Sequence, residues 1–192
     1  LEFRRVSSDL WVTPIAQNYR GYTLHEIPPN GQGIAALIAL GILENFDLAS
    51  LAVDGVDSQH LQIEAMKLAF ADVYRYVAEP SAMAVTPAQM LDDAYLASRA
   101  RLIDMKRAQN FGAGNPVKGG TIYLSAADED GMMVSFIQSN YMGFGSGCVE
   151  PDFGVSLQNR GHAFAVKPDG LNPANLVAPG KRPFHKIGRA HV

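Results

Sequence analysis

The chain has 192 residues, of which 47% are hydrophobic and 18% charged, and its formal net charge is −3. This composition is typical of a globular domain with one substantial core, and its acidic balance argues against a nucleic-acid partner, which would favour a basic face. No apolar run reaches the roughly 18 residues of a membrane span. The single cysteine, Cys148, excludes an internal disulfide and a cysteine-rich metal site. We therefore expect no membrane span, no metal and no cofactor.

The first predicted elements are a short strand and an apolar helix. Residues 22–27 alternate apolar and polar side chains and stop at Pro28, which predicts a strand. Residues 34–46 carry apolar side chains at helical spacing and follow the loop Asn30-Gly31-Gln32-Gly33. A glycine loop at a helix start can bind an anion. This loop lacks the lysine of a P-loop and the third glycine of a dinucleotide site, which favours a tight turn.

Two further helices are predicted before residue 110. Residues 60–77 form an amphipathic pattern with Ser58 as the expected N-cap. The expected buried stripe consists of Ile63, Met66, Phe70 and Val73. We interpret His60 as a surface or cap residue, because no second ligand stands at a metal-binding spacing. The pair Thr86-Pro87 predicts the start of a third helix that runs to about residue 108.

The composition changes after residue 110. Residues 110–120 are rich in Gly, Asn and Pro and predict a linker. Residues 122–127 and 132–138 flank an acidic turn at 128–131, which predicts a β-hairpin. The carboxylates of that turn lack the other ligands of a calcium loop. A further strand is expected at 154–158.

The triplet Gly119-Gly120-Thr121 stands between the linker and the predicted hairpin. Two glycines allow backbone conformations closed to other residues, so the peptide before Thr121 can be bent and exposed. Cleavage there would give Thr121 a hydroxyl and a free amine on adjacent carbons, which is a nucleophile with its own base. From the residue types alone, a simple loop end remains the alternative.

Sequence blocks in both halves resemble the gamma-glutamyltranspeptidase family. Those similar to the start of its small subunit are Gly119-Gly120-Thr121, Asp128-x-Asp130-Gly131, Gly143-Phe144-Gly145-Ser146-Gly147 and Gly180-Lys181-Arg182-Pro183. Those similar to the end of its large subunit are Tyr19-Arg20-Gly21-Tyr22, Pro28-Pro29-Asn30-Gly31-Gln32-Gly33 and residues 63–72. The blocks occur in family order. Residues 138–141 and 158–161 resemble the family's divergent, transpeptidase-like branch more than its glutathione-degrading branch.

The resemblance implies an α+β fold, a fragment of the αββα sandwich of the N-terminal-nucleophile hydrolases. Residues 1–120 would be the C-terminal part of the large-subunit region, mostly helical and ending in the linker. Residues 121–185 would be the start of the small-subunit region, mostly β. Residues 186–192 leave the family pattern and could be encoded by a sequencing adapter, so we expect a non-native tail there. The family proteins are longer, which implies truncation at both ends.

The resemblance also implies a self-processing precursor that is cut between Gly120 and Thr121. The Thr121 hydroxyl would attack the Gly120 carbonyl, and hydrolysis of the resulting ester would free the Thr121 amine. Thr121 would then attack a small-molecule γ-glutamyl amide, such as glutathione, or a related acyl amide, and pass the acyl group to water or an amine. The large and small subunits of one precursor would be each other's partners after cleavage.

Other site residues follow from the same alignment. Ser139 aligns with a hydroxyl residue that hydrogen-bonds the nucleophile, and Asn159 with an asparagine lining the acyl pocket. Arg160 and Tyr141 stand where the transpeptidases carry glutamine and asparagine, and Ala163 replaces an acid that binds the substrate α-amino group. Losing that acid weakens the case for a glutamyl group, whereas Arg160 favours a carboxylate.

Three functional interpretations therefore stay open. They are a γ-glutamyl hydrolase or transferase, a glutaryl- or cephalosporin-type acylase, and a non-catalytic binding or structural module. The family's oxyanion glycines would lie beyond His185 and its carboxylate-binding arginine before Leu1. Because loss of oxyanion donors lowers rates by about two to three orders of magnitude, we expect the 192-residue chain alone to be inactive. Cytoplasmic, periplasmic and secreted locations all remain open.

Overall fold

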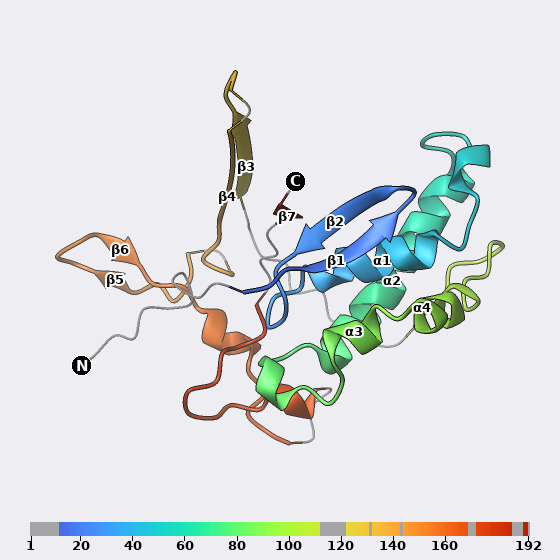
Figure 1. The fold of residues 1–192 in the computed structure, drawn as a ribbon. Helices are drawn as coiled ribbons and strands as arrows, with labels where there is room; N and C mark the ends of the chain where they lie inside the picture. Colours follow the sequence, from blue (N-terminus) through green and yellow to red (C-terminus); the bar gives the residue numbers. More distant parts are fainter. Residues whose placement is uncertain are drawn as a thin grey trace.

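The computed structural model describes residues 12–111, 122–130, 132–142, 144–168, 172–185 and 190–191. A helical body is formed by the first of these ranges, and two β-hairpins extend away from it (Figure 1). The body contains strands β1 (Ile15–Tyr19) and β2 (Tyr22–Glu26) and helices α1 (Ile34–Leu43), α2 (Val56–Tyr76), α3 (Pro87–Met90) and α4 (Asp93–Ala100). Within the described ranges no helix is long and apolar enough to cross a membrane.

Helix α1 is the centre of the core. Ile34, Leu37, Ile38 and Ile42 are each 0% exposed, as expected for a helix that is apolar on every side. The β1–β2 hairpin covers one side of α1 and helices α2 and α4 pack on others. A Cβ atom on Gly41 would lie 2.4 Å from Leu96 Cδ1, so a glycine here lets α4 approach α1 closely. The predicted strand at 22–27 and the predicted apolar helix are confirmed, whereas β1 was not expected.

Helix α2 buries a face that only partly overlaps the predicted one, because Val73 is buried and Phe70 packs against the core but the other two predicted residues are exposed. Ile63 is 56% exposed and Met66 is 39% exposed. The buried residues include Leu61, Ala65, Leu68, Ala69 and Val73, together with the carboxylates Glu64 and Asp72. Small alanines on this face allow close packing on α1, and the two acids have basic partners, Lys67 and Arg99. The predicted N-cap is also wrong, because α2 begins at Val56 after Gly55 and Ser58 lies inside it.

The predicted third helix is two short helices. The expected start is confirmed, since Thr86 Oγ1 accepts a hydrogen bond from Gln89 N at 3.2 Å in a capping box. The helix stops at Met90, and Asp92 caps the next one by accepting a bond from Tyr95 N at 2.9 Å. Asp92 is a strong N-cap in the middle of the predicted helix, which explains the break.

Residues 101–111 follow α4 without entering another helix. His60 Nε2 lies 2.9 Å from the Asp104 carbonyl oxygen. His60 is therefore half-buried and connects α2 to this segment, so it is not a simple surface residue. Among the described residues no group of three or more His, Cys, Asp or Glu side chains could hold a metal ion.

The predicted hairpin after the linker is confirmed. Strands β3 (Ile122–Ala127) and β4 (Met133–Gln138) pair antiparallel, with Ile122 opposite Gln138. The carboxylate of Asp128 shapes the turn, because its Oδ1 accepts bonds from Asp130 N at 3.1 Å and Met132 N at 2.8 Å. These acids are exposed, as expected for a solvated turn.

Shorter elements follow in chain order. A second hairpin pairs β5 (Val149–Glu150) with β6 (Val155–Ser156), so the expected strand at 154–158 is shorter than predicted. The remaining elements are the 3-10 helices η1 (Leu48–Ser50), η2 (Pro80–Ala82), η3 (Arg160–Ala163) and η4 (Pro173–Asn175) and the strand β7 (Ala190–His191), which pairs with β2.

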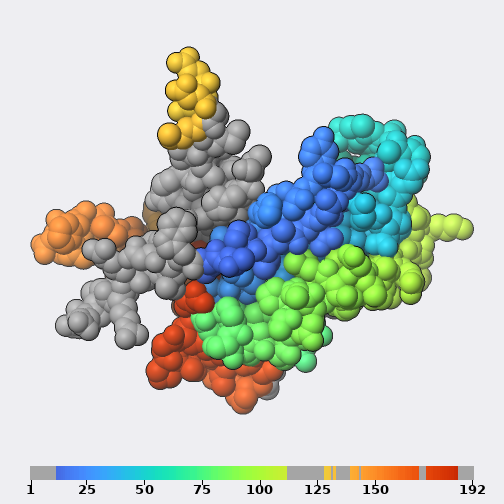
Figure 2. All heavy atoms as spheres, in the orientation of Figure 1, coloured from blue at the N-terminus to red at the C-terminus, as the bar shows by residue number. Residues whose placement is uncertain are grey.

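The segment 172–185 returns to the helical body. Arg182 donates two hydrogen bonds of 2.7 Å each to the carboxylate of Glu79, and these bonds hold the pKa of Glu79 below its ordinary value. Asn172 Nδ2 donates to the Val77 carbonyl at 2.9 Å, and Asn30 Nδ2 donates to the Pro183 carbonyl at 2.7 Å. Figure 2 shows this segment in red against the green segment that follows α2. These hydrogen bonds therefore connect residues before position 120 to residues after position 121.

Candidate active site

The predicted nucleophile, Thr121, and its neighbour Gly120 lie outside the described residues. Strand β3 begins at Ile122, which is the next residue in the sequence. On the partner strand, Gln138 is paired with Ile122, and Ser139 follows Gln138 directly. Ser139 is half-buried, and its Oγ accepts a hydrogen bond from Tyr141 N at 3.0 Å.

The structure brings four of the predicted site residues together, although they come from two separate sequence segments. Met142 N donates a hydrogen bond to Asn159 Oδ1 at 3.1 Å, and Asn159 N donates to the Asn140 carbonyl at 3.3 Å. These bonds tie residues 139–142, which follow β4, to residues 158–160, which lead into η3. Ser139, Tyr141, Asn159 and Arg160 therefore form one cluster, which we call the site cluster.

Within the site cluster, Arg160 is stacked on Tyr141. The guanidinium carbon lies 4.9 Å from the centroid of the Tyr141 ring, which is a cation–π contact. Tyr141 has a φ of 78°, a left-handed conformation that bulky residues rarely adopt. The Tyr141 ring also lies near the His162 ring, and their centroids are 6.1 Å apart. Arg160 is only 3% exposed, and desolvation by this burial lowers its pKa.

Two residues of this region were missed by sequence reasoning. Gln158 Oε1 accepts a hydrogen bond from Arg160 Nε at 3.4 Å. Asn175 is buried, its Nδ2 donates to the Ala163 carbonyl, and its Oδ1 accepts from Phe184 N at 3.2 Å. Gln158 could have been found as a polar side chain two positions before Arg160. Asn175 lies in a stretch predicted only as irregular, and no local pattern marked it.

Gly145 allows the two segments to approach each other. Its φ is 71°, and a Cβ atom there would lie 2.5 Å from the Leu157 carbonyl oxygen and 3.3 Å from Asn140 Cβ. The neighbouring Ser146 N donates to the same carbonyl at 2.8 Å. Any side chain at position 145 would therefore push residues 140 and 157 apart.

Replacing Gly145 with alanine is expected to open the site cluster and to lower stability by about 1–3 kcal/mol, from the left-handed φ and the backbone clash together. Urea unfolding of the purified chain measures the loss. Gly154→Ala is the matched control: it has a similar φ of 66° and no atom within 4 Å of an added Cβ. Equal losses for the two variants would contradict the steric part of this prediction.

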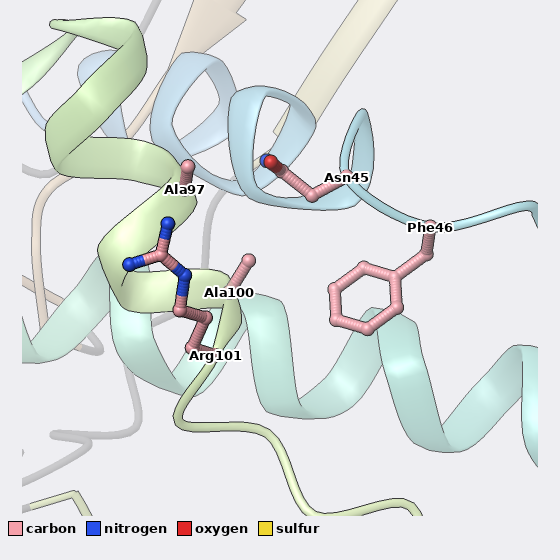
Figure 3. Close-up of a pocket in the computed structure, with 5 residues that line it drawn as sticks. All are labelled: Asn45, Phe46, Ala97, Ala100 and Arg101. Atoms are coloured by element: carbon pink, nitrogen blue, oxygen red, sulfur yellow. The ribbon is translucent and has the colours of Figure 1, made fainter.

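A surface hollow of about 280 Å³ lies elsewhere, between the end of α1 and α4 (Figure 3). It is lined by Asn45, Phe46, Ala97, Ala100 and Arg101. None of the predicted site residues lines it, so the hollow is not part of the site cluster.

The sequence model of the family described as Gamma-glutamyltranspeptidase matches residues 8–188. The chain belongs to the gamma-glutamyltranspeptidase family. The expectation drawn from the sequence blocks is thereby confirmed, and the matched region includes the hairpins β1–β2, β3–β4 and β5–β6 and the site cluster.

Several curated proteins are similar to the chain. The "Glutathione hydrolase-like YwrD proenzyme" of Bacillus subtilis (strain 168) is 35% identical over 182 residues, covering 95% of this chain and 34% of the relative. The "Oxamate amidohydrolase proenzyme" of Klebsiella pneumoniae is 37% identical over 177 residues, covering 92% and 32%. The chain spans about a third of the length of these relatives.

A comparison with a solved structure supports the fold. The cephalosporin acylase from Bacillus halodurans is 50% identical with a TM-score of 0.82, and the alignment covers 94% of this chain and 32% of that one. The predicted fold class is confirmed: the chain is a mixed helix-and-strand fragment of the N-terminal-nucleophile hydrolase fold.

Proposed function

We propose that this chain is a segment of a self-processing N-terminal-threonine amidohydrolase or acyltransferase, with Thr121 as the nucleophile and Gly120–Thr121 as the processing bond. One observation carries the proposal. Thr121 immediately precedes Ile122, the first residue of β3. Ser139 immediately follows Gln138, the β4 residue that is paired with Ile122. A hydroxyl at position 139 is therefore suited to hydrogen-bond a nucleophile at position 121. The names of the relatives, which are proenzymes, agree with a precursor that is cut.

The proposed mechanism uses the chain's own groups. The Thr121 hydroxyl attacks the Gly120 carbonyl and the amide becomes an ester, which water hydrolyses to release the Thr121 amine. A free α-amine has a pKa of roughly 8, so its neutral form can take the proton that the hydroxyl gives up. Thr121 then forms an acyl ester with the substrate, and water or an amine accepts the acyl group. Asn159 lines the acyl side of the site.

For the substrate, the first candidate is a γ-glutamyl amide such as glutathione. Relatives named glutathione hydrolase, including the Escherichia coli (strain K12) proenzyme at 33% identity, support it. The second candidate is an acyl amide without an α-ammonium group. Relatives named oxamate amidohydrolase and Acylase ACY 1 support this candidate, as does Ala163 in place of an acid.

We also propose that residues up to 120 and residues from 121 onward belong to two processed chains that stay together as partners. The bidentate pair of Arg182 and Glu79, which are 103 positions apart, supports this part of the proposal. This ion pair would hold residues before position 120 and residues after position 121 together once the Gly120–Thr121 bond is cut. The hydrogen bond from Asn172 to Val77 adds a second tie.

Intact-mass measurement of the full-length protein tests the proposal. We expect two chains, the second of which begins with Thr121 and carries a free amine. An unbroken Gly120–Thr121 bond in a preparation that still hydrolyses amides would overturn the proposed mechanism. An unbroken bond in a preparation without amidase activity would favour a non-catalytic binding or structural module instead.

A further inference from the structure

The guanidinium of Arg160 lies where a substrate in solution cannot reach it. Arg160 is 3% exposed, and its Nη1 and Nη2 atoms are buried without a hydrogen-bond partner among the described residues. Its Nε donates one long bond of 3.4 Å to the neutral amide of Gln158. The guanidinium carbon also lies over the face of the Tyr141 ring, 4.9 Å from its centroid. A buried cation without an anion is costly, and an aromatic face attracts it, so Tyr141 is the residue on which Arg160 can act.

The backbone of Tyr141 is strained and needs contacts of this kind. Its φ of 78° lies in the left-handed region, which a bulky side chain seldom enters. Such a conformation persists only when the surroundings determine it. Asn159 Oδ1 accepts a bond of 3.1 Å from the next backbone donor, Met142 N, while Arg160 packs on the Tyr141 ring. One short segment therefore fixes Tyr141 through both its ring and the peptide that follows it.

The backbone conformation of Tyr141 in turn fixes the hydroxyl of Ser139. Tyr141 N donates a hydrogen bond of 3.0 Å to Ser139 Oγ. Because that oxygen accepts the bond, the hydroxyl's own hydrogen is directed away from the Tyr141 N–H. Accepting a bond also polarises a hydroxyl and strengthens it as a donor. Ser139 is the residue proposed above to hydrogen-bond Thr121, so the Tyr141 N–H sets the position and the donor strength of that hydroxyl.

We propose that Arg160 is a positioning residue that acts through Tyr141 on Ser139. The guanidinium holds the ring, the ring holds the left-handed backbone, and the backbone N–H holds the serine oxygen in place. This inference rests on the proposed function, because it adds to the site of Thr121 a residue that touches no substrate. Loss of the cation should therefore lower kcat and the rate of self-processing, whereas loss of a substrate-binding arginine would raise KM.

The first test replaces Arg160 with methionine in the full-length protein. Methionine fills a similar volume and removes a buried charge, a change that proteins often tolerate, so Arg160→Met is expected to fold. Rates are measured with γ-glutamyl and glutaryl p-nitroanilide, and cleavage before Thr121 is followed by intact mass after cell-free synthesis. We expect kcat and the cleavage rate to fall by about 10- to 100-fold, as when a reacting group is displaced by about 1 Å, while KM changes by less than about 3-fold.

A change of residue at position 141 tests whether the effect depends on the Tyr141 backbone. Glycine adopts a φ near 78° without strain, and asparagine tolerates it better than most residues. Tyr141→Gly and Tyr141→Asn therefore no longer need the cation. In either background we expect Arg160→Met to change kcat and the cleavage rate by less than about 3-fold. A substrate-binding arginine would keep its effect in both backgrounds. If neither anilide is hydrolysed, the cleavage rate alone decides, because processing needs no added substrate.

Two control variants complete the comparison. Arg160→Lys keeps a cation but not the planar group that stacks on the ring, so its kcat should lie between those of the unaltered protein and Arg160→Met. Arg101→Met removes an exposed arginine outside the site cluster and should leave kcat, KM and the cleavage rate unchanged. If Arg160→Met does not fold, Arg160→Lys replaces it in the two Tyr141 backgrounds, where its smaller loss should also disappear.

The inference fails if Arg160→Met raises KM instead of lowering kcat, or if its loss is the same in the Tyr141→Gly and Tyr141→Asn backgrounds. It also fails if both backgrounds alone lose as much kcat as Arg160→Met, because the ring itself would then act on the substrate. Intact mass is measured on every preparation. Cleavage before Thr121 with any of these results overturns only the inference. Turnover without cleavage, or neither cleavage nor turnover in the unaltered protein, overturns the proposed function.

Discussion

Thr121→Ala in the full-length protein is expected to leave a single uncut chain and to lower amidase activity by about four to six orders of magnitude, the range seen when an enzyme loses its nucleophile. The expected loss is this large because one hydroxyl would serve twice. It would attack the Gly120 carbonyl during processing, and it would form the acyl ester during turnover. Denaturing gel electrophoresis with intact mass follows the first role, and anilide hydrolysis follows the second.

Thr121→Ser and Ser125→Ala are the controls for this prediction. Thr121→Ser keeps the hydroxyl and the backbone amine, so we expect it to be cut and to retain activity within about 100-fold of the unaltered protein. Ser125 lies on the same strand, paired with Ser135 and away from the strand end at Ile122, and its replacement should have little effect. An active, uncut Thr121→Ala protein would rule out position 121 as the nucleophile.

Local sequence signals predicted the elements whose structure is determined locally. The hairpin at 122–138 follows from two β-branched, aromatic-rich runs around an acidic turn, and the Asp128 side chain forms that turn within four residues. The capping box at Thr86 is equally local. The face that α2 buries was not predictable in this way, because the helix offers two apolar stripes. The choice between them depends on α1 and α4, which pack against the smaller residues.

For the candidate site, the resemblance pointed to the residues but not to their surroundings. Asn159 and Arg160 were predicted from their alignment, yet the burial of Arg160 depends on how closely residues 139–145 approach residues 157–160. That approach depends on Gly145, where an added Cβ would clash with the Leu157 backbone. The pair of Glu79 and Arg182 joins positions 103 apart in the sequence, and neither residue carries a local signal of its partner.

Arg99→Ala is expected to lower the free energy of unfolding of the 192-residue chain by about 3–5 kcal/mol at pH 7, because it leaves a buried carboxylate without its cation. Asp72 is 5% exposed on the buried face of α2. Its Oδ1 lies 2.9 Å from Arg99 Nη2, and its Oδ2 accepts a hydrogen bond of 2.9 Å from the Tyr95 hydroxyl. Urea unfolding measures the change. Arg101→Ala, an exposed arginine two positions away, should stay within about 0.5 kcal/mol.

The loss in Arg99→Ala should shrink as the pH falls. Burial raises the pKa of Asp72 above its ordinary value, and Arg99 and the Tyr95 hydroxyl lower it only in part. Removing Arg99 therefore raises that pKa further. A carboxyl with a raised pKa in the folded state is easiest to bury when protonated, so folding loses stability as the pH rises above the ordinary value of 3.8. The difference between Arg99→Ala and the unaltered chain should be largest at neutral pH and smaller near pH 4.

Adding Asp72→Asn to Arg99→Ala completes the comparison, because it removes the buried charge that the single variant leaves behind. We expect the double variant to recover part of the lost stability and to lose most of the pH dependence. A loss in Arg99→Ala that is equal at pH 7 and pH 4, and that Asp72→Asn does not relieve, would assign the effect to the packing of the arginine side chain. Packing contacts do not titrate, so the pH profile separates the two causes.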